Sequence, residues 1–211
     1  MQTNCYLVWD KKTKFVIIID PGDDGEYIIQ RVQDLGIVPV MIVATHGHFD
    51  HVCASLEVKL AFNIPFYLHQ SDEFLLKRAQ ESARHWTGIE VDPPAPVDGF
   101  LKIDQMINFG NQQLKILHTP GHTPGGVCLY SENHKALFTG DTLFANGGVG
   151  RTDFSYSSEG DLHQSINKIF QLDVEVEVYP GHGQSTNISN ERIFHKHNHN
   201  YRTTVCGSYD N

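Results

Sequence analysis

Seven histidine and aspartate residues stand in short segments that each follow an expected β-strand. They are His46, His48, Asp50, His51, His122, Asp141 and His182. The first four lie within six residues, where mutual repulsion and desolvation would be costly unless a cation were shared. Histidine is the commonest metal ligand, and carboxylate oxygens also bind zinc. The spacing therefore predicts a metal centre rather than isolated surface side chains.

The number of these ligands indicates two metal ions. Seven nitrogen and oxygen ligands exceed the four of one tetrahedral site and fit two ions that share a carboxylate. The expected first set is His46, His48 and His122, the second is Asp50, His51 and His182, and Asp141 is the bridge. Two ions about 3.5–4 Å apart can hold a bridging hydroxide near neutral pH and polarise a carbonyl, which predicts hydrolysis. Zinc is the first choice for this ligand set, with iron and manganese as alternatives.

A glycine directly precedes each of the last three ligands. The segments run over residues 119–126, 138–142 and 179–183. Glycine allows a sharp backbone turn and a close approach to a ligand. We expect these three loops to converge with the first four ligands at one edge of a pair of sheets.

The elements that must position these residues alternate irregularly between strands and helices. Strands are expected at residues 5–9, 15–19, 40–44, 66–68, 114–117, 127–130, 136–138 and 174–179, and helices at 27–35, 52–62, 71–83 and 161–170. Several consecutive strands lack an intervening helix, which argues against a doubly wound parallel sheet. The pattern predicts an α/β fold in which helices cover the outer faces of a β-sandwich. We expect one domain over residues 1–211, with 195–211 as an irregular tail.

Composition excludes several classes of function. The chain has 211 residues and a net charge of −9, from 16 Lys and Arg against 25 Asp and Glu. Affinity for nucleic acids and for anionic membranes depends on basic residues, so neither partner is expected. The four cysteines form no Cys-x-x-Cys pair, and isolated cysteines suit a reducing compartment. Without a recognisable signal peptide or a membrane-length apolar run, a cytoplasmic location is expected.

Aromatic residues near the ligand loops offer walls for a substrate. Phe49, Trp86, Phe144, Phe154 and Tyr156 could line the mouth of the site, with positions in the core as the alternative. Large aromatic side chains supply most of the contact area in either setting.

The order of the ligands resembles the signature of the metallo-β-lactamase superfamily. That signature is His-x-His-x-Asp-His followed by a later His, Asp and His, and each member has a counterpart among the seven residues. The resemblance extends over nearly the whole chain. It implies a four-layer αβ/βα sandwich with the metals at one edge.

Within the superfamily, the sequence around the ligands looks most like glyoxalase II-type hydroxyacylglutathione hydrolases. Segments 119–126, 141–144 and 150–154 carry this likeness. It implies that a metal-bridging hydroxide cleaves a thioester such as S-lactoylglutathione, with Asp50, Asp141 and Arg151 as catalytic residues. Arg151 is expected near the metal edge, either beside a ligand or against an anionic group of the substrate.

The thiol half of the substrate stays open at this point. Full-length glyoxalase II continues into a helical domain that supplies much of the glutathione contact, whereas this chain ends 29 residues after His182. Glutathione is therefore one candidate for the thiol, and the oligomeric state is not predicted.

The alternative function is that of a mononuclear-iron persulfide dioxygenase. Those enzymes share the fold and the sequence Gly-Arg-Thr-Asp-Phe, which stands here at 150–154. Their last ligand lies in a segment resembling Pro-Ala-His-Asp, whereas the segment here is Pro180–Gly183. β-Lactamases of this fold usually have cysteine where Asp141 stands, which counts against that activity.

Overall fold

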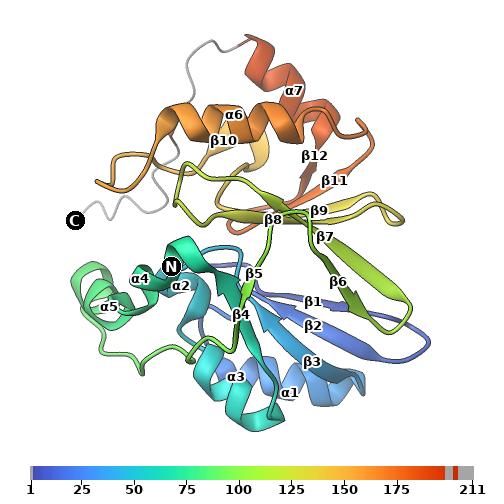
Figure 1. Cartoon of the computed structure of the whole chain (residues 1–211), viewed down its shortest axis with the longest axis vertical. Helices are drawn as coiled ribbons and strands as arrows, with labels where there is room; N and C mark the ends of the chain where they lie inside the picture. The colour runs from blue at the N-terminus through green and yellow to red at the C-terminus, as the bar shows by residue number, and fades with distance from the viewer. Residues whose placement is uncertain (1, 198–201, 204–211) are drawn as a thin grey trace.

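Two mixed β-sheets lie face to face in the computed structural model, which describes residues 2–197 and 202–203 (Figure 1). The first sheet has the order β1-β2-β3-β4-β5, with β1 at Tyr6–Trp9, β2 at Phe15–Ile19, β3 at Val38–Val43, β4 at Phe66–His69 and β5 at Gly99–Leu101. The second has the order β12-β11-β9-β8-β7-β6, with β6 at Met106–Phe109, β7 at Gln112–His118, β8 at Val127–Ser131, β9 at Ala136–Gly140, β11 at Glu177–Pro180 and β12 at Thr186–Asn187. A short separate pair joins β10 (Gly148–Val149) to β13 (Arg202–Thr203).

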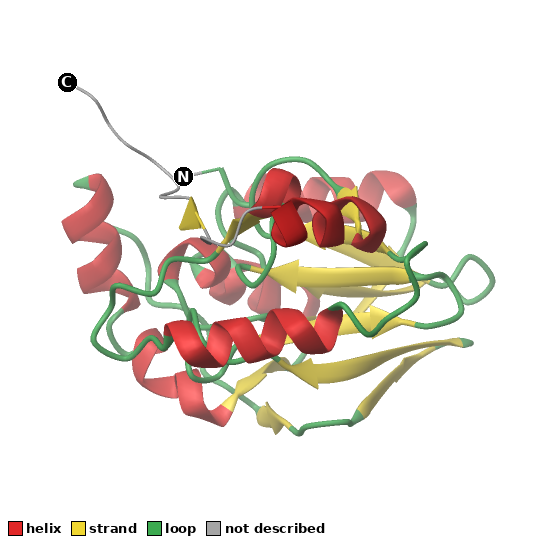
Figure 2. Cartoon of the chain, turned by 90° about the horizontal axis from the view of Figure 1, so that it is seen from above, coloured by secondary structure: helices red, strands yellow, loops and turns green. Residues whose placement is uncertain are grey.

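Helices cover the outer face of each sheet, as Figures 1 and 2 show. The helices are α1 (Gly25–Leu35), α2 (Phe49–Val52), α3 (Ser55–Phe62), α4 (Glu73–Leu76), α5 (Ala79–Thr87), α6 (Glu159–Ile169) and α7 (Ile188–His197). α1 and α3 cover the first sheet and α6 and α7 cover the second, which confirms the four-layer αβ/βα sandwich. Within the described part of the chain, no helix is both long and apolar enough to cross a membrane.

Strand β2 shows how the sequence places the core between these layers. Ile17 and Ile19 pack in the cluster shared with the second sheet, whereas Val16 and Ile18 pack in the cluster shared with α1 and α3. Successive side chains of a strand point to opposite faces. A strand covered on both faces is therefore apolar throughout, which explains the uninterrupted run Val16–Ile19.

The strand ends bring the candidate ligands to one edge of the sandwich. β2, β3 and β4 are parallel neighbours, and β9 and β11 are parallel in the other sheet. Parallel strands end at the same edge of a sheet, which is where open α/β sheets bind ligands. The segments after β3, β9 and β11 carry His46, Asp141 and His182.

Two of the predicted helices are broken. The helix expected at 52–62 begins earlier, as α2, and is interrupted before α3. The helix expected at 71–83 is divided into a 3₁₀ turn at Gln70–Asp72 and the helices α4 and α5. Ser71, the first residue of the expected helix, lies inside the 3₁₀ turn, and the N-caps of α4 and α5 are Asp72 and Arg78.

The buried side chain of Asp72 accounts for the second break. Its carboxylate accepts hydrogen bonds from the amides of Gly47 and Gly125, at 3.0 and 2.6 Å, and from the Thr123 hydroxyl at 2.7 Å. These partners belong to the two loops that carry the first histidines and His122. The chain at Asp72 is thereby tied to both loops, and this tertiary contact overrides the local helical pattern.

The end of the chain differs from the expected irregular tail. α7 continues through His197, so that prediction is wrong for residues 195–197, and it is also wrong for 202–203, which form β13. The rest of 195–211 lies outside the described residues. The α7 helix is anchored by the buried Glu191, which accepts hydrogen bonds from the amides of Asn146 and Gly147 at 3.1 and 2.7 Å.

Candidate metal centre

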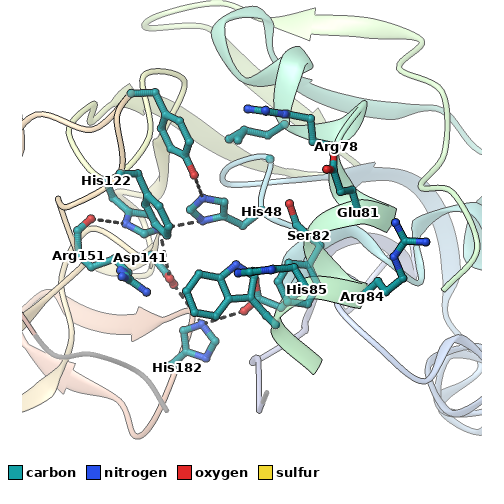
Figure 3. Close-up of a pocket in the computed structure, with 18 of the residues that line it drawn as sticks. His48, Arg78, Glu81, Ser82, Arg84, His85, His122, Asp141, Arg151 and His182 are labelled. Atoms are coloured by element: carbon teal, nitrogen blue, oxygen red, sulfur yellow. Dashed lines mark hydrogen bonds and ion pairs between the residues drawn. The ribbon is translucent and has the colours of Figure 1, made fainter. Parts of the chain in front are cut away.

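The seven predicted ligands converge in one small volume at the strand-end edge of the sandwich. Three groups have ligand atoms within 4.8 Å of one another: His46, His48 and His122; His46, His51 and Asp141; and Asp50, His51 and His182. The first and last groups are the two sets expected from the sequence, and the middle group connects them. Figure 3 shows four of these side chains, His48, His122, Asp141 and His182, gathered on one side of a cavity.

The first set places three ring nitrogens close together. His48 Nδ1 lies 3.0 Å from His46 Nε2 and 2.9 Å from His122 Nε2. Burial, assisted by the neighbouring His51 and His48, holds the pKa of His46 well below its ordinary value. Burial and the neighbouring His122 lower the pKa of His48 to about 3. Neutral imidazoles grouped in this way can offer lone pairs to a cation.

The second set combines two imidazoles with a carboxylate. His182 Nε2 lies 3.4 Å from both His51 Nε2 and Asp50 Oδ2. Burial alone would raise the pKa of Asp50, but the nearby rings of His51 and His182 lower it to about 2. Asp50 is therefore ionised at neutral pH, as a metal-binding carboxylate must be.

Asp141 lies between the two sets. Its Oδ1 is 3.3 Å from His51 Nε2 and 3.5 Å from His182 Nε2, and its Oδ2 is 3.6 Å from His122 Nε2. One carboxylate oxygen thus faces each set, which is the placement expected of a bridging ligand. Oδ1 is buried and accepts no hydrogen bond from the described residues. Burying a charged oxygen without a partner is costly, and a bound cation would remove that cost.

The acids around His51 make the centre attractive to positive charge. Burial lowers the pKa of His51, but Asp141, Asp20 and Asp50 outweigh that effect and raise the pKa to about 10. Binding of a cation at His51 would therefore release a proton, because a ligand nitrogen must be deprotonated to bind a metal. The donor set of five imidazoles and two carboxylates fits divalent zinc, iron or manganese.

Hydrogen bonds on the outer side of two rings fix their orientation. His122 Nδ1 donates to the carbonyl of Arg151, and His182 Nδ1 donates to the carbonyl of Gln2, both at 2.8 Å. A carbonyl oxygen only accepts, so the neutral form of each ring presents the lone pair of Nε2 to the cluster. The N-terminal residues thus help to build the centre, and residue spacing gave no signal of this.

Asp20, which was not among the residues predicted for the site, orients two further candidate ligands. Its Oδ2 accepts hydrogen bonds from His51 Nδ1 at 2.9 Å and from the Thr45 hydroxyl at 2.7 Å. Because that hydroxyl donates to Asp20, it accepts from His46 Nδ1 at 3.2 Å. Asp20 directly follows a buried strand, as several of the candidate ligands do. This position in the sequence could have marked it as a residue of the site.

Tyr156 supports His48 from the cavity side. Its hydroxyl lies 2.8 Å from His48 Nε2, the nitrogen that faces away from the first set. Its ring stacks on Phe154, with the ring centroids 5.2 Å apart and the planes at 14°. The sequence suggested a place at the mouth of the site but not the hydrogen bond, because the two residues are 108 positions apart.

Close packing explains why glycine recurs beside the ligands. A Cβ added at Gly181 would lie 2.4 Å from Asp141 Oδ1 and 2.6 Å from His51 Cε1. At Gly150 it would lie 2.0 Å from the carbonyl oxygen of Asp141. These distances are far inside van der Waals contact, so no other residue fits without moving the ligands.

A cavity of about 510 Å³ opens beside the cluster (Figure 3). Its size is typical of a small-molecule site. All five aromatic residues proposed as mouth residues line it: Phe49, Trp86, Phe144, Phe154 and Tyr156. The wall opposite the cluster comes from the α4–α5 region and contributes Leu75, Arg78, Glu81, Ser82, Arg84, His85 and Trp86.

Arg151 lies at the metal edge, but its guanidinium is already paired. It donates to both carboxylate oxygens of Asp153, at 2.6 and 2.5 Å. The guanidinium carbon also lies 5.4 Å from the ring centroid of Trp86 and 4.5 Å from that of Phe154. The backbone carbonyl of Arg151 accepts the hydrogen bond from His122, so the residue lies beside a candidate ligand.

Comparisons with known proteins agree with this geometry. A family model described as the metallo-beta-lactamase superfamily matches residues 1–182. The chain is 36% identical over 193 residues to the Haemophilus influenzae protein named hydroxyacylglutathione hydrolase GloC, covering 90% of each chain. It superposes on the structure of BLEG-1 B3 metallo-beta-lactamase with a TM-score of 0.84 and 36% identity, covering 91% of this chain and 92% of that one. For TTHA1623 in a di-iron-bound form the TM-score is 0.82 and the identity 37%, over 90% and 92% of the two chains.

Proposed function

Because this chain belongs to the metallo-beta-lactamase superfamily and is a metallo-hydrolase, we propose that it hydrolyses thioesters with two divalent metal ions. His46, His48 and His122 would hold the first ion, Asp50, His51 and His182 the second, and Asp141 would bridge them. Zinc is the first choice of metal, and the di-iron form of the similar TTHA1623 makes iron the main alternative.

The position of Asp141 is the observation that carries this proposal. One of its oxygens faces His51 and His182, and the other faces His122. A centre for a single ion would need no carboxylate that spans two separate sets of donors. The geometry therefore favours a two-metal hydrolase over the mononuclear dioxygenase considered from the sequence.

The chain's own residues prepare this centre for hydrolysis. When bound, two divalent ions supply a water of lowered pKa and an electrophilic contact for a carbonyl oxygen. Asp20 holds His51 in position, and the Arg151 carbonyl holds His122. Asp50 and Asp141 act as ligands, and Arg151 acts through His122 and as part of the cavity wall. The cavity confines the substrate beside the cluster.

A thioester suits such a centre for a chemical reason. A thiolate leaves without strong protonation, so the reaction needs no dedicated general acid. The similarity to a protein named hydroxyacylglutathione hydrolase supports S-lactoylglutathione as the first substrate to assay. The free cysteines Cys5, Cys53 and Cys128 suit a reducing compartment, and we place the reaction in the cytoplasm.

A panel of substrates tests the proposal. Protein purified with its metals is mixed with S-lactoylglutathione, a cephalosporin, or glutathione persulfide, and thiol release, ring opening and oxygen consumption are recorded. We expect thiol release from the thioester, reduced by orders of magnitude in Asp50→Asn. Oxygen consumption with the persulfide and no thioester cleavage would show that the protein is a persulfide dioxygenase and not a thioesterase. Ring opening alone would show that it is a β-lactamase, an activity named for the similar BLEG-1.

A further inference from the structure

Helix α5 presents a defined face to the cavity. Arg78, at the N-cap of the helix, and Ser82 and His85 follow helical spacing and line the cavity. Ala79 and Ala83, on a neighbouring face of the helix, are each only 1% exposed. Figure 3 shows Arg78 and Ser82 across the cavity from His122 and Asp141. A substrate whose carbonyl lies at the metal centre would therefore extend toward this face.

The α5 wall carries cations that are free of ion pairs. Arg78 and Arg84 are exposed and line the cavity, and neither forms an ion pair with any described carboxylate. Arg151, by contrast, is neutralised by its two contacts with Asp153. Glu81 is the acidic residue of the same wall. The wall thus keeps a positive charge in a chain whose net charge is −9.

Aromatic stacking fixes α5 relative to the metal centre. Trp86, near the end of α5, lies against the guanidinium of Arg151, whose carbonyl holds His122. Phe154 covers the guanidinium at a distance of 4.5 Å. These contacts connect the α5 wall to the residue that holds His122, which lowers the entropic cost of ordering a ligand between them.

We infer that Arg78 anchors a carboxylate on the thiol half of the substrate. A guanidinium pairs with a carboxylate through two parallel hydrogen bonds, and Arg78 forms no ion pair with any described carboxylate, including Glu81 of the same wall. The preferred substrates are thus thioesters of carboxylate-bearing thiols, with the carboxylate distant from the scissile bond. This inference rests on the proposed function, which places the acyl carbonyl at the metal centre, and it adds the group that selects the thiol.

Binding of an unreactive analogue tests the subsite without relying on catalysis. S-Propylglutathione and its diethyl ester differ only at the two carboxylates, which are esterified in the second compound. Calorimetry gives the affinity of each compound for the metal-loaded protein. We expect the wild type to prefer the free acid by about tenfold, the contribution of a charge-assisted hydrogen bond. Arg78→Gln should remove this preference, and Arg78→Lys should keep part of it.

Lys77→Gln is the matched control, because it removes the neighbouring positive charge. Lys77 pairs with Glu73 and does not line the cavity, so the preference should stay at the wild-type value. Equal affinity of the wild type for acid and diester, or an unchanged preference in Arg78→Gln, would overturn the subsite.

The kinetic readout separates the two proposals. In Arg78→Gln, KM for S-lactoylglutathione should rise about tenfold with little change in kcat, while cleavage of S-lactoyl-N-acetylcysteamine, which lacks a carboxylate, stays unchanged. If the wild type cleaves neither thioester but the analogue preference depends on Arg78, the proposed function fails and the subsite stands. If both thioesters are cleaved and Arg78→Gln affects them equally, the subsite fails and the proposed function stands.

Discussion

His51 Nδ1 donates a hydrogen bond to Asp20 Oδ2 at 2.9 Å, and both side chains are almost fully buried. Asp20 follows strand β2 with a φ of 51°, in the left-handed region that Asp and Asn adopt more readily than other non-glycine residues. Its carboxylate also accepts hydrogen bonds from the amide and the hydroxyl of Thr45. One acid thus connects the end of a core strand with both sets of ligands.

Replacing Asp20 should weaken metal binding without unfolding the chain. Asn tolerates the same backbone conformation, but Asp20→Asn removes the charge and replaces one acceptor oxygen with an NH₂ group at a carboxylate that accepts from three donors. We expect 10–100-fold weaker metal binding, greater at the set that contains His51, as is typical when the partner of a ligand is lost. Titration against a chelating indicator measures it. Asp24→Asn makes the same change at the same φ of 51°, at the exposed N-cap of α1, and should leave metal affinity unchanged. Equal affinities for the two variants would contradict this role.

A methyl group at position 181 should disrupt the second set of candidate ligands, Asp50, His51 and His182. The Cβ of Gly181→Ala would collide with Asp141 Oδ1 and with the His51 ring. We expect loss of at least one metal ion per chain and more than tenfold lower activity, measured after desalting. Gly160→Ala is the control, because a Cβ there meets nothing within 4 Å in helix α6. It should stabilise the fold by about 0.5–1 kcal/mol and keep both ions. A Gly181→Ala protein with full metal content would show that the packing is looser than described.

The hydroxyl of Tyr156 should matter more than its ring. Tyr156→Phe keeps the stacking on Phe154 but removes the group that lies 2.8 Å from His48 Nε2. Without that partner, the His48 ring is less firmly oriented, so we expect about tenfold weaker binding at the first set. Thermal unfolding should change little, and the exposed Tyr27→Phe serves as control. Unchanged metal affinity in Tyr156→Phe would show that the Tyr156 hydroxyl does not support metal binding by His48.

Asp10 should make stability depend on acid pH. Hydrogen bonds from the amides of Asn111 and Lys12 hold the pKa of its carboxyl well below the ordinary value. A pKa lower in the folded than in the unfolded chain adds stability above the unfolded pKa of about 3.9, and this stability is lost as the pH falls further. We expect the difference in stability between wild type and Asp10→Asn, measured by urea unfolding, to be largest at pH 6–7 and to shrink steadily as the pH falls below about 4, toward the lowered pKa of the folded state. A difference that is constant with pH would contradict the assigned cause.

The clustering of the seven candidate ligands could be predicted from the sequence because their signal is local. Four of them stand within six residues, and the other three each follow a glycine after a strand, so residue type and spacing were sufficient. Strand β2 was equally clear, because a strand buried on both faces is apolar at every position. Helix α1 ends at residue 35, as expected from the sequence, and the following Gly36 caps it with a φ of 58°.

The supporting residues could not be predicted because their contacts are distant in sequence. Asp72 joins two loops that lie 25 and 53 positions away, and the Gln2 carbonyl orients His182 across 180 positions. Helical periodicity at 71–83 carried no sign of these bonds, so the division of this segment into a 3₁₀ turn, α4 and α5 was missed. Arg78 lies at the start of α5 and lines the cavity, a position that the expected continuous helix did not indicate.

The metal content of the purified protein is the most direct test of the central claim. Untagged protein, prepared without chelators, is analysed for zinc, iron and manganese per chain. Two sets of ligands with Asp141 between them predict about two divalent ions per chain. One iron per chain with little zinc would contradict the two-metal centre and favour the mononuclear dioxygenase.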